Sequence, residues 1–408
     1  MKSTQLAASV TRTVWIVATT AVVIVAIFTL PPFRNYQLAT IAAYVCATAG
    51  LTVLIGRNGQ LSLGHGALMA CGAYTFALTA NSMGDAGVTG IAVMLVPLAT
   101  AVVLTSVVGM IVGAAAARLH GPYLAGLTLA LVVAIPSITT TFSGLLGGDQ
   151  GLWAYVEGPP SGISALFTVE QWHATVAVLA AAVTVLALSN LISGESGRRM
   201  QAVRDDEIAA RLSGIDVTRT KITTFVASSG AAGLGGGVLA MVTQSASPGA
   251  FGVTFSLFLL MGVVVGGLGS LLGAVWGAVL LVVLPALVAA LTDSLHMSPA
   301  LAERLDGNLA IALFGVAVIA VVLVAPSAFR VCSLALCTPC HYAGAPRATD
   351  RVRFPRPFPS PPHRKQRHTD DQIPATPDPA RRTRGDRDPH RSRMRQRYQR
   401  DRQFLRRG

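Results

Sequence analysis

The chain is dominated by apolar runs that are long enough to cross a lipid bilayer. A helix needs about 17 to 25 mainly apolar residues for one crossing, and only 12% of all residues are charged, against about 25% in an ordinary soluble domain. Ten runs reach or approach the required length: residues 14–30, 37–55, 61–80, 89–115, 122–142, 172–191, 222–242, 254–267, 271–291 and 308–324. The sequence therefore predicts an all-α polytopic membrane protein with about ten transmembrane helices, and it leaves a count of nine or ten open.

Lysine and arginine predict how these spans are oriented, because cytoplasmic loops are enriched in them. The loops 81–88, 143–171 and 244–253 contain neither residue, which places them outside. Arg34 and Arg304 are the exceptions on that side. The alternate connections contain Arg57, Arg118, Arg198, Arg199, Arg204, Arg211, Arg219 and Lys221. With an even number of spans, we expect both termini in the cytoplasm.

The formal net charge of +13 belongs to the end of the chain and not to its apolar body. Residues 330–408 contain 20 of the 32 basic residues and 7 of the 19 acidic ones, so the rest of the chain is neutral. We expect no nucleic-acid partner. From residue 326 onward, arginine and proline replace the aliphatic residues, and such a segment cannot bury enough apolar area to fold. Two origins stay open for this tail: a genuine basic segment resting on anionic lipid, or the product of a frameshift.

The predicted organisation is a transmembrane domain over 1–325, a polar intracellular loop at 195–220 within it, and a disordered Arg/Pro-rich tail over 326–408. The C-x-x-C-H pattern at Cys337–His341, with Cys332 nearby, has a spacing used for haem attachment or metal binding. No surrounding domain could enclose such a group, so we expect no metal site and no cofactor in this chain.

Two glycine-rich segments interrupt apolar runs at corresponding places in the two halves of the chain. They read SLGHGALMACG and MGVVVGGLGSLLG. Interrupted helices of this kind point to the substrate path of a transporter, because their freed backbone groups can face a cavity. Small residues at this spacing are also typical of simple helix packing. The candidate path residues are Ser62, Gly64, His65, Gly66, Gly266, Gly267 and Gly269.

His65 has three interpretations. An ionisable group within a span usually faces a cavity or the bundle interior, so it could contact substrate or carry a proton. It could instead make a hydrogen bond that holds two helices together. A third possibility is a position near the inner membrane surface, since Arg57 is only eight residues away.

The loop segment AVRDDEIAARLSGID, residues 202–216, predicts a short amphipathic helix. Asp205 or Asp206 suits its start, and Gly214 suits its end. The simpler interpretation is a solvent-exposed surface helix that binds no partner. The alternative is a docking helix that presents apolar residues such as Leu212, together with the charges of Arg204, Asp206 and Glu207, to a cytoplasmic partner.

The chain has no G-x-x-x-x-G-K-[ST] motif, so it has no phosphate-binding loop of its own. Paired carboxylates, a metal cluster or a nucleophile with a base at chemical spacing are also missing from the sequence. These patterns argue against an enzyme. If the chain moves a solute uphill, the energy comes from another subunit or from an ion gradient.

Several segments resemble one known family in order and in spacing. These segments, spread over residues 37 to 325, are GRNGQLSLGHGALMACGAY, HGPYLAGLTLA, GGDQGLW, GRRMQAVRDDEIAARLSGIDVTRTKITTFVASSGAAGLGGGVLA and SPGAFGVTFSLFLLMGVVVGGLGSLLGAVWGA. Together they are similar to the LivM-type permeases of bacterial branched-chain amino acid ABC importers. The departure is the long basic tail, since members of that family commonly end soon after an equivalent of APSAFR.

This resemblance implies a multi-pass subunit of the bacterial inner membrane that works by alternating access. Its implied partners are a homologous LivH-type permease, two cytoplasmic ABC ATPases that use ATP and magnesium, and a periplasmic or extracellular solute-binding protein. Within the loop, Glu207, Ala209, Ala210 and Gly214 resemble the E-A-A-x-x-x-G element that seats a permease helix in its ATPase. The resemblance therefore implies an ATPase-coupling role for 204–214.

Two other functions remain open at this point. A urea or short-chain amide permease of the same class would share these motifs. A gradient-driven secondary transporter would need no ATPase partner. The sequence does not separate the substrates.

Overall fold

A computed structural model describes residues 2–119, 122–160, 162, 166–294 and 315–316 of the chain. The helices of the first half are α1 (Lys2–Ile27), α2 (Pro32–Thr52), the π-helix η1 (Val53–Arg57), α3 (His65–Asp85), α4 (Ala92–Ala116), α5 (Pro122–Thr141), α6 (Ser143–Leu146) and the 3-10 helix η2 (Gly148–Gln150). Those that follow are α7 (Val169–Ser193), α8 (Glu195–Asp205), α9 (Glu207–Leu212), α10 (Val217–Thr243), the 3-10 helix η3 (Pro248–Phe251), α11 (Val253–Gly266) and α12 (Leu271–Ser294). Two short strands complete the described elements, β1 (Leu152–Trp153) and β2 (Ser245–Ala246).

The expected all-α membrane architecture is confirmed. Six helices in the described part of the chain are long and apolar enough to cross a membrane: α1, α2 with η1, α4, α5, α7 and α10. The helices α3, α11 and α12 occupy the other expected spans up to residue 291. The tenth expected span, 308–324, lies outside the described residues except for Gly315 and Val316. The tail from 326 onward also lies outside them, so the count of ten stays a prediction.

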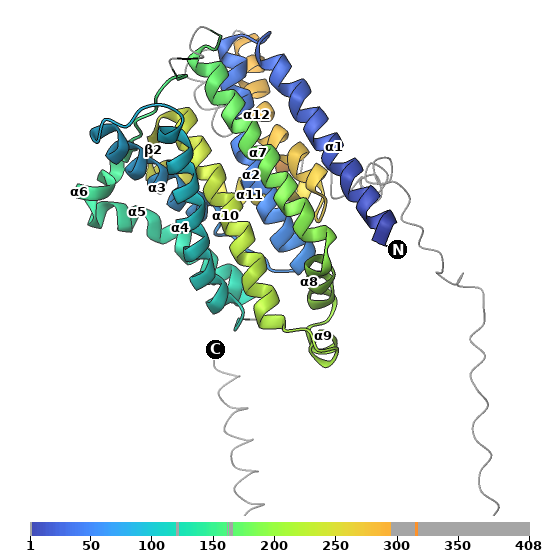
Figure 1. Cartoon of the computed structure of the whole chain (residues 1–408). Coiled ribbons are helices and arrows are strands. Elements are labelled where there is room, and N and C mark those ends of the chain that lie inside the picture. The colour runs from blue at the N-terminus through green and yellow to red at the C-terminus, as the bar shows by residue number, and fades with distance from the viewer. Residues whose placement is uncertain (1, 120–121, 161, 163–165, 295–314, 317–408) are drawn as a thin grey trace, which may run out of the picture. The chain divides into compact units, whose positions relative to one another are not determined.

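Helix α10 forms the centre of the bundle and is buried over most of its length (Figure 1). It packs against α2, α3, α4 and α7. Its middle reads SSGAAGLGGG and provides a surface almost without side chains. Small residues let neighbouring backbones approach closely, which is how helices gain packing contacts where lipid removes the hydrophobic driving force. The composition of α10 thus explains why other helices surround it.

The crossing of α3 over α10 depends on two glycines. A Cβ atom placed on Gly72 of α3 would lie 2.2 Å from the carbonyl oxygen of Gly233. A Cβ atom on Gly236 of α10 would lie 1.9 Å from the carbonyl oxygen of Met69. Neither site has room for a methyl group, so the two backbones are in direct contact here.

The second glycine-rich segment folds as a helical hairpin made of α11 and α12. Gly262 faces Gly277, and Gly266 faces Gly273. A Cβ atom built on Gly277 would lie 2.2 Å from the Gly262 carbonyl oxygen, and one built on Gly266 would lie 1.9 Å from the Gly273 carbonyl oxygen. The turn uses Gly267 and Gly269, which have φ values of 107° and 88° that favour glycine. The break that the sequence predicts between these two helices is confirmed, and the glycine stripe packs the two arms together.

The two ends of the bundle are formed by different elements. At one end, β1 pairs antiparallel with β2, which joins the connection before α7 to the connection after α10. These strands are a small exception to the all-helical expectation. At the other end, α8 lies below α7 and beside the lower part of α10, and α9 lies at the tip (Figure 1). Because α10 runs over 27 residues between these ends, they are about 40 Å apart along its axis.

Candidate functional site

Residues 58–64 connect η1 to α3 without forming a helix, although they are buried for the most part. Gly59, with φ of 72°, ends η1, and its amide donates to the Ile55 carbonyl at 3.1 Å. The sequence predicts that the third span starts at Leu61, and this boundary is wrong, because α3 begins at His65. Gly59 ends the preceding helix with a positive φ, and Gly64 is the N-cap of α3. The first candidate path residues therefore lie at the start of α3 and in the buried segment that leads to it.

Hydroxyl groups from three other helices meet the beginning of α3. The Leu63 amide donates to Thr128 Oγ1 of α5 at 2.9 Å, and the Gly66 amide donates to Ser256 Oγ of α11 at 3.1 Å. His65 Nε2 lies 2.9 Å from Ser228 Oγ of α10. The first amides of a helix have no partner within the helix, and Ser256 supplies an acceptor for one of them at Gly66. Thr128 accepts from the residue before Gly64, and Ser228 bonds the His65 ring.

Gly64 and Gly66 suit this arrangement because they have no side chain, and Ser62 suits it because it accepts a local hydrogen bond. The Gly64 amide donates to Ser62 Oγ at 3.3 Å. A Cβ atom on Gly64 would lie 2.8 Å from the Thr128 carbonyl oxygen, and one on Gly66 would lie 2.3 Å from Ser256 Oγ. The two glycines thus let the chain pass close to α5 and α11. The structure brings the first four candidate path residues together.

The same buried segment contains polar atoms that have no hydrogen-bond partner among the described residues. They are both amide atoms of Asn58, Oε1 of Gln60 and Nδ1 of His65. The side chains are at most 4% exposed. Leaving a buried polar group unpaired costs about 1–3 kcal/mol, so a run of such groups is typical of a place that water, a solute or a second conformation occupies.

Gly266, Gly267 and Gly269 lie elsewhere, at the far end of α11. The hydroxyl of Ser256 marks the other end of this helix, ten residues before Gly266, which corresponds to about 15 Å. The two candidate glycine groups are therefore not brought into one cluster. Gly269 instead contacts the end of η1, since Arg57 Nε donates to its carbonyl oxygen at 3.1 Å.

The loop residues form two helices where the sequence predicts one. Asp206 is in extended conformation and separates α8 from α9. Its Oδ1 accepts hydrogen bonds from the amides of Ile208 at 2.8 Å and Ala209 at 3.1 Å, so it caps α9. Gly214, with φ of 81°, ends the turn that follows. The caps are therefore where the sequence places them, and the break arises because Asp206 stops one helix and starts the next.

The apolar residues of this loop fall on two surfaces. Val203, Ala210 and Val217 pack together in a small buried cluster. Ile208 and Leu212 are four residues apart on the same face of α9, and they are 73% and 86% exposed. Two large aliphatic side chains at the tip of a charged loop form an uncovered apolar contact surface.

Two charged groups attach this loop to the bundle. Glu207 of α9 forms an ion pair with Lys221 of α10, whose side chain is only 6% exposed. Arg204 of α8 donates from Nη1 to the carbonyl oxygen of Gly56. Of the seven predicted coupling residues, the exposed Arg204 and the half-buried Glu207 each contact the bundle, Ala210 is buried, Asp206 and Gly214 shape the loop, and Ala209 and Leu212 are exposed.

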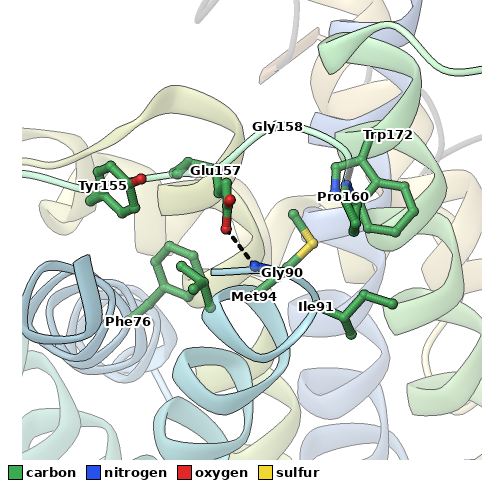
Figure 2. A pocket seen from close by; sticks show the side chains of 11 residues that line it. Phe76, Gly90, Ile91, Met94, Tyr155, Glu157, Gly158, Pro160 and Trp172 are labelled. Carbon is green, nitrogen blue, oxygen red and sulfur yellow. Dashed lines mark hydrogen bonds between the residues drawn. The ribbon is translucent and has the colours of Figure 1, made fainter. Parts of the chain in front are cut away.

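One pocket lies at the opposite end of the bundle and contains none of the predicted site residues. It has a volume of about 280 Å³, which includes its opening to solvent. Figure 2 shows mainly apolar side chains around it, with the Glu157 carboxylate accepting a hydrogen bond from the Gly90 amide at 2.8 Å. This bond fastens the connection before α7 to the start of α4.

Within the described residues, no group of three or more histidine, cysteine, aspartate or glutamate side chains could hold a metal ion. Cys332, Cys337, Cys340 and His341 lie outside those residues. The expectation that this chain carries no cofactor stays a prediction.

The sequence does not indicate that the hydroxyls of Thr128, Ser228 and Ser256 bond residues at the start of α3. It also does not indicate that the Gly56 carbonyl is the partner of Arg204. Each of the three hydroxyl residues lies within an apolar helix, and such residues commonly make hydrogen bonds between helices. That signal indicates an interhelical contact, but a single sequence does not identify the partner.

Comparison with known proteins gives one family for this arrangement. Residues 35–325 match the model of the branched-chain amino acid transport system permease component. The LivM permease protein of a high-affinity branched-chain amino acid transport system in Salmonella typhimurium strain LT2 is 32% identical over 248 residues, covering 56% of this chain and 57% of the relative. Its counterpart in Escherichia coli K12 is 29% identical with the same coverage. The matched region thus spans little more than half of these relatives. No solved structure gives a significant match.

Proposed function

Because the chain belongs to the permease component family of branched-chain amino acid transport systems, we propose that it is the membrane-spanning permease subunit of an ATP-driven importer for branched-chain amino acids. Separate cytoplasmic ATPases provide the energy. A homologous LivH-type permease completes the membrane part, and a solute-binding protein delivers the substrate from outside. The chain itself has no catalytic role in this proposal.

The observation that carries the proposal is the exposed pair Ile208 and Leu212 on α9. A helix with apolar residues four apart is suited to a groove on a partner protein. The loop that holds this helix is fastened to the bundle by Glu207 and Arg204. A partner that moves α9 therefore moves the ends of η1 and α10 with it, and this is the arrangement an importer needs in order to use energy from a separate subunit.

The distribution of basic residues supports the proposed orientation. The loop of α8 and α9 contains Arg198, Arg199, Arg204 and Arg211, while the connections 86–91, 142–168 and 244–252 at the β1–β2 end contain no lysine or arginine. Arg34 and Arg304 are the exceptions expected on that side. Cytoplasmic loops carry such an excess. The proposal therefore places α9 in the cytoplasm of a bacterium, the β1–β2 end outside, and both chain termini inside.

Alternating access requires a path whose two ends open in turn. The segment 59–64, which precedes α3, and the 267–270 turn are non-helical backbone, and non-helical backbone at membrane depth is found where protein or a cavity covers it. Ser62 and Gly64 lie in the first segment, and His65 and Gly66 begin α3 directly after it. Gly267 and Gly269 lie in the second segment, directly after Gly266 ends α11. In the proposed mechanism, these two segments change conformation as the ATPases close and reopen. A largely uncharged path suits a zwitterion, whose charged ends helix termini can meet.

The test is uptake into proteoliposomes by the complex of both permeases, both ATPases and the binding protein. ATP-dependent accumulation of leucine, isoleucine or valine is the expected result. Accumulation of urea alone would contradict the substrate assignment. Uphill uptake by this chain without an ATPase would contradict the importer assignment as a whole.

A second arm tests the docking surface. We expect the double variant Ile208→Asp and Leu212→Asp to lose the copurifying ATPase and ATP-dependent uptake together. Leu166→Asp is the matched control, because Leu166 is also a highly exposed leucine but precedes α7 at the other end of the bundle. Unchanged ATPase binding in the double variant would exclude α9 as the docking helix.

A further inference from the structure

Arg204 contacts the end of η1 with both its charge and its aliphatic stem. Its guanidinium donates to the Gly56 carbonyl oxygen. A Cβ atom built on Gly59 would lie 3.1 Å from Arg204 Cγ, so the stem lies directly on the turn that ends η1. The last carbonyls of a helix have no partner within it, and a basic side chain near that end is favourable. A residue 148 positions later in the sequence thus caps the helix formed by α2 and η1.

The capped end is in turn attached to the turn between α11 and α12. A Cβ atom on Gly56 would lie 2.2 Å from the Gly269 amide nitrogen, which means that the two backbones touch. The neighbouring Arg57 donates from Nε to the Gly269 carbonyl oxygen at 3.1 Å. Contact through backbone leaves no side chain to absorb a displacement, so a shift at Gly56 must also shift Gly269.

Helix α9 is connected to the same segment from its other side. Glu207 pairs with Lys221 at the start of α10. The carbonyl oxygen of Lys221 accepts a hydrogen bond from Gln60 Nε2 at 3.4 Å. The loop therefore holds residues 56–60 through Arg204 on α8 and through Lys221 on α10.

We propose that Arg204 is a positioning residue that transmits movement of α8 and α9 to the end of η1 and, through Gly56 and Arg57, to the 267–270 turn. In this arrangement Arg204 contacts the transmembrane bundle of its own chain, and it does not contact the ATPase. The inference rests on the proposed function for the origin of the movement, whereas the mechanical connection is a property of this chain alone.

Hydrogen–deuterium exchange of the full chain in the assembled complex tests the connection directly. The amides of Gly59, Gln60 and Gly267 are donors in the two connected segments, to Ile55, Leu54 and Val263 respectively. In Arg204→Ala we expect peptides covering 56–60 and 266–270 to exchange about tenfold faster, the factor that corresponds to one lost hydrogen bond of about 1.4 kcal/mol. Arg199→Ala is the control, since Arg199 lies on the same helix and pairs with Glu195 at 2.5 Å on an exposed surface. Faster exchange confined to 203–213 would overturn the proposal.

Transport coupling provides the second readout. We expect Arg204→Ala to keep its ATPase within about twofold of the parent amount and to lower the substrate carried per ATP by about tenfold, again the factor for one such hydrogen bond. Arg204→Lys keeps a donor and is expected to recover most of this loss. If Arg204→Ala instead releases the ATPase, then Arg204 is a docking residue and the proposal is wrong. If the parent complex transports nothing, the proposed function fails, but the exchange measurement still decides whether Arg204 connects the two segments.

Discussion

His65 Nε2 lies 2.9 Å from Ser228 Oγ, which joins the first residue of α3 to the middle of α10. Both side chains are buried, with at most 1% of their surface exposed. This hydrogen bond is the contact that the packing interpretation of His65 expects. A role for the ring in substrate passage stays a prediction, and Nδ1, which has no partner among the described residues, is the atom that remains for it.

Replacing Ser228 with alanine removes this contact and leaves His65 Nε2 buried without a partner. We expect the free energy of unfolding to fall by about 1–3 kcal/mol, the usual cost of an unpaired buried polar group. The measurement is a chemical or thermal unfolding curve of the purified protein in detergent. Ser229→Ala is the control, because Ser229 Oγ donates only to the Phe225 carbonyl of its own helix, at 2.8 Å. Equal losses in the two variants would show that the bond to His65 contributes nothing.

Gly72→Ala should separate α3 from α10, since the new Cβ atom would lie 2.2 Å from the Gly233 carbonyl oxygen. Overpacking of a close interface costs about 1–3 kcal/mol, and we expect a lower unfolding temperature. Gly126→Ala in α5 is the matched control, because a Cβ atom there meets nothing within 4 Å. The control should leave the unfolding temperature unchanged or raise it, because alanine favours a helix over glycine.

Asp206→Ala should weaken α9, because the carboxylate caps the amides of Ile208 and Ala209. Loss of such a cap typically costs about 1 kcal/mol. In hydrogen exchange, we expect faster exchange over 207–213, together with less copurifying ATPase. Asp206→Asn retains an acceptor and should behave nearly as the parent does. If asparagine were as harmful as alanine, the charge and not the cap would be the feature that matters.

Glu207→Gln removes the carboxylate that pairs with the nearly buried ammonium of Lys221. Breaking a fully buried pair costs about 3–5 kcal/mol, and the 31% exposure of Glu207 reduces this figure, so we expect a loss of about 1–2 kcal/mol in unfolding measurements. The second variant, Glu207→Gln with Lys221→Met, removes the ammonium as well and should recover part of the loss. Failure of the double variant to recover would assign the loss to other contacts of Glu207.

The sequence was informative wherever a local rule governs the backbone. The lengths of the apolar runs indicate where the long helices lie. The acidic residues and the glycine of the loop indicate the caps of α9 at Asp206 and Gly214. The break at Gly267 and Gly269 was also predictable, because a run of glycines in a helical pattern permits backbone angles that other residues avoid.

Features that depend on distant parts of the chain could not be predicted. Nothing local indicates that Thr128, Ser228 and Ser256 meet the same helix end, or that Arg204 reaches Gly56. The division of the loop's apolar residues between two surfaces could not be predicted either. Val203 belongs to the buried cluster and Ile215 packs at its edge, whereas Ile208 and Leu212 are exposed.

The short length of α11 has a consequence for how this protein is made. Its 14 residues extend about 21 Å, less than the roughly 30 Å of a bilayer core, so its terminal turn cannot rest in lipid without a partner for its polar backbone. Gly56 and Arg57, which cover that turn, are synthesised about two hundred residues earlier. The α11–α12 hairpin is therefore synthesised after the residues that cover its turn. We expect insertion of the carboxyl-terminal half to depend on correct insertion of the amino-terminal half.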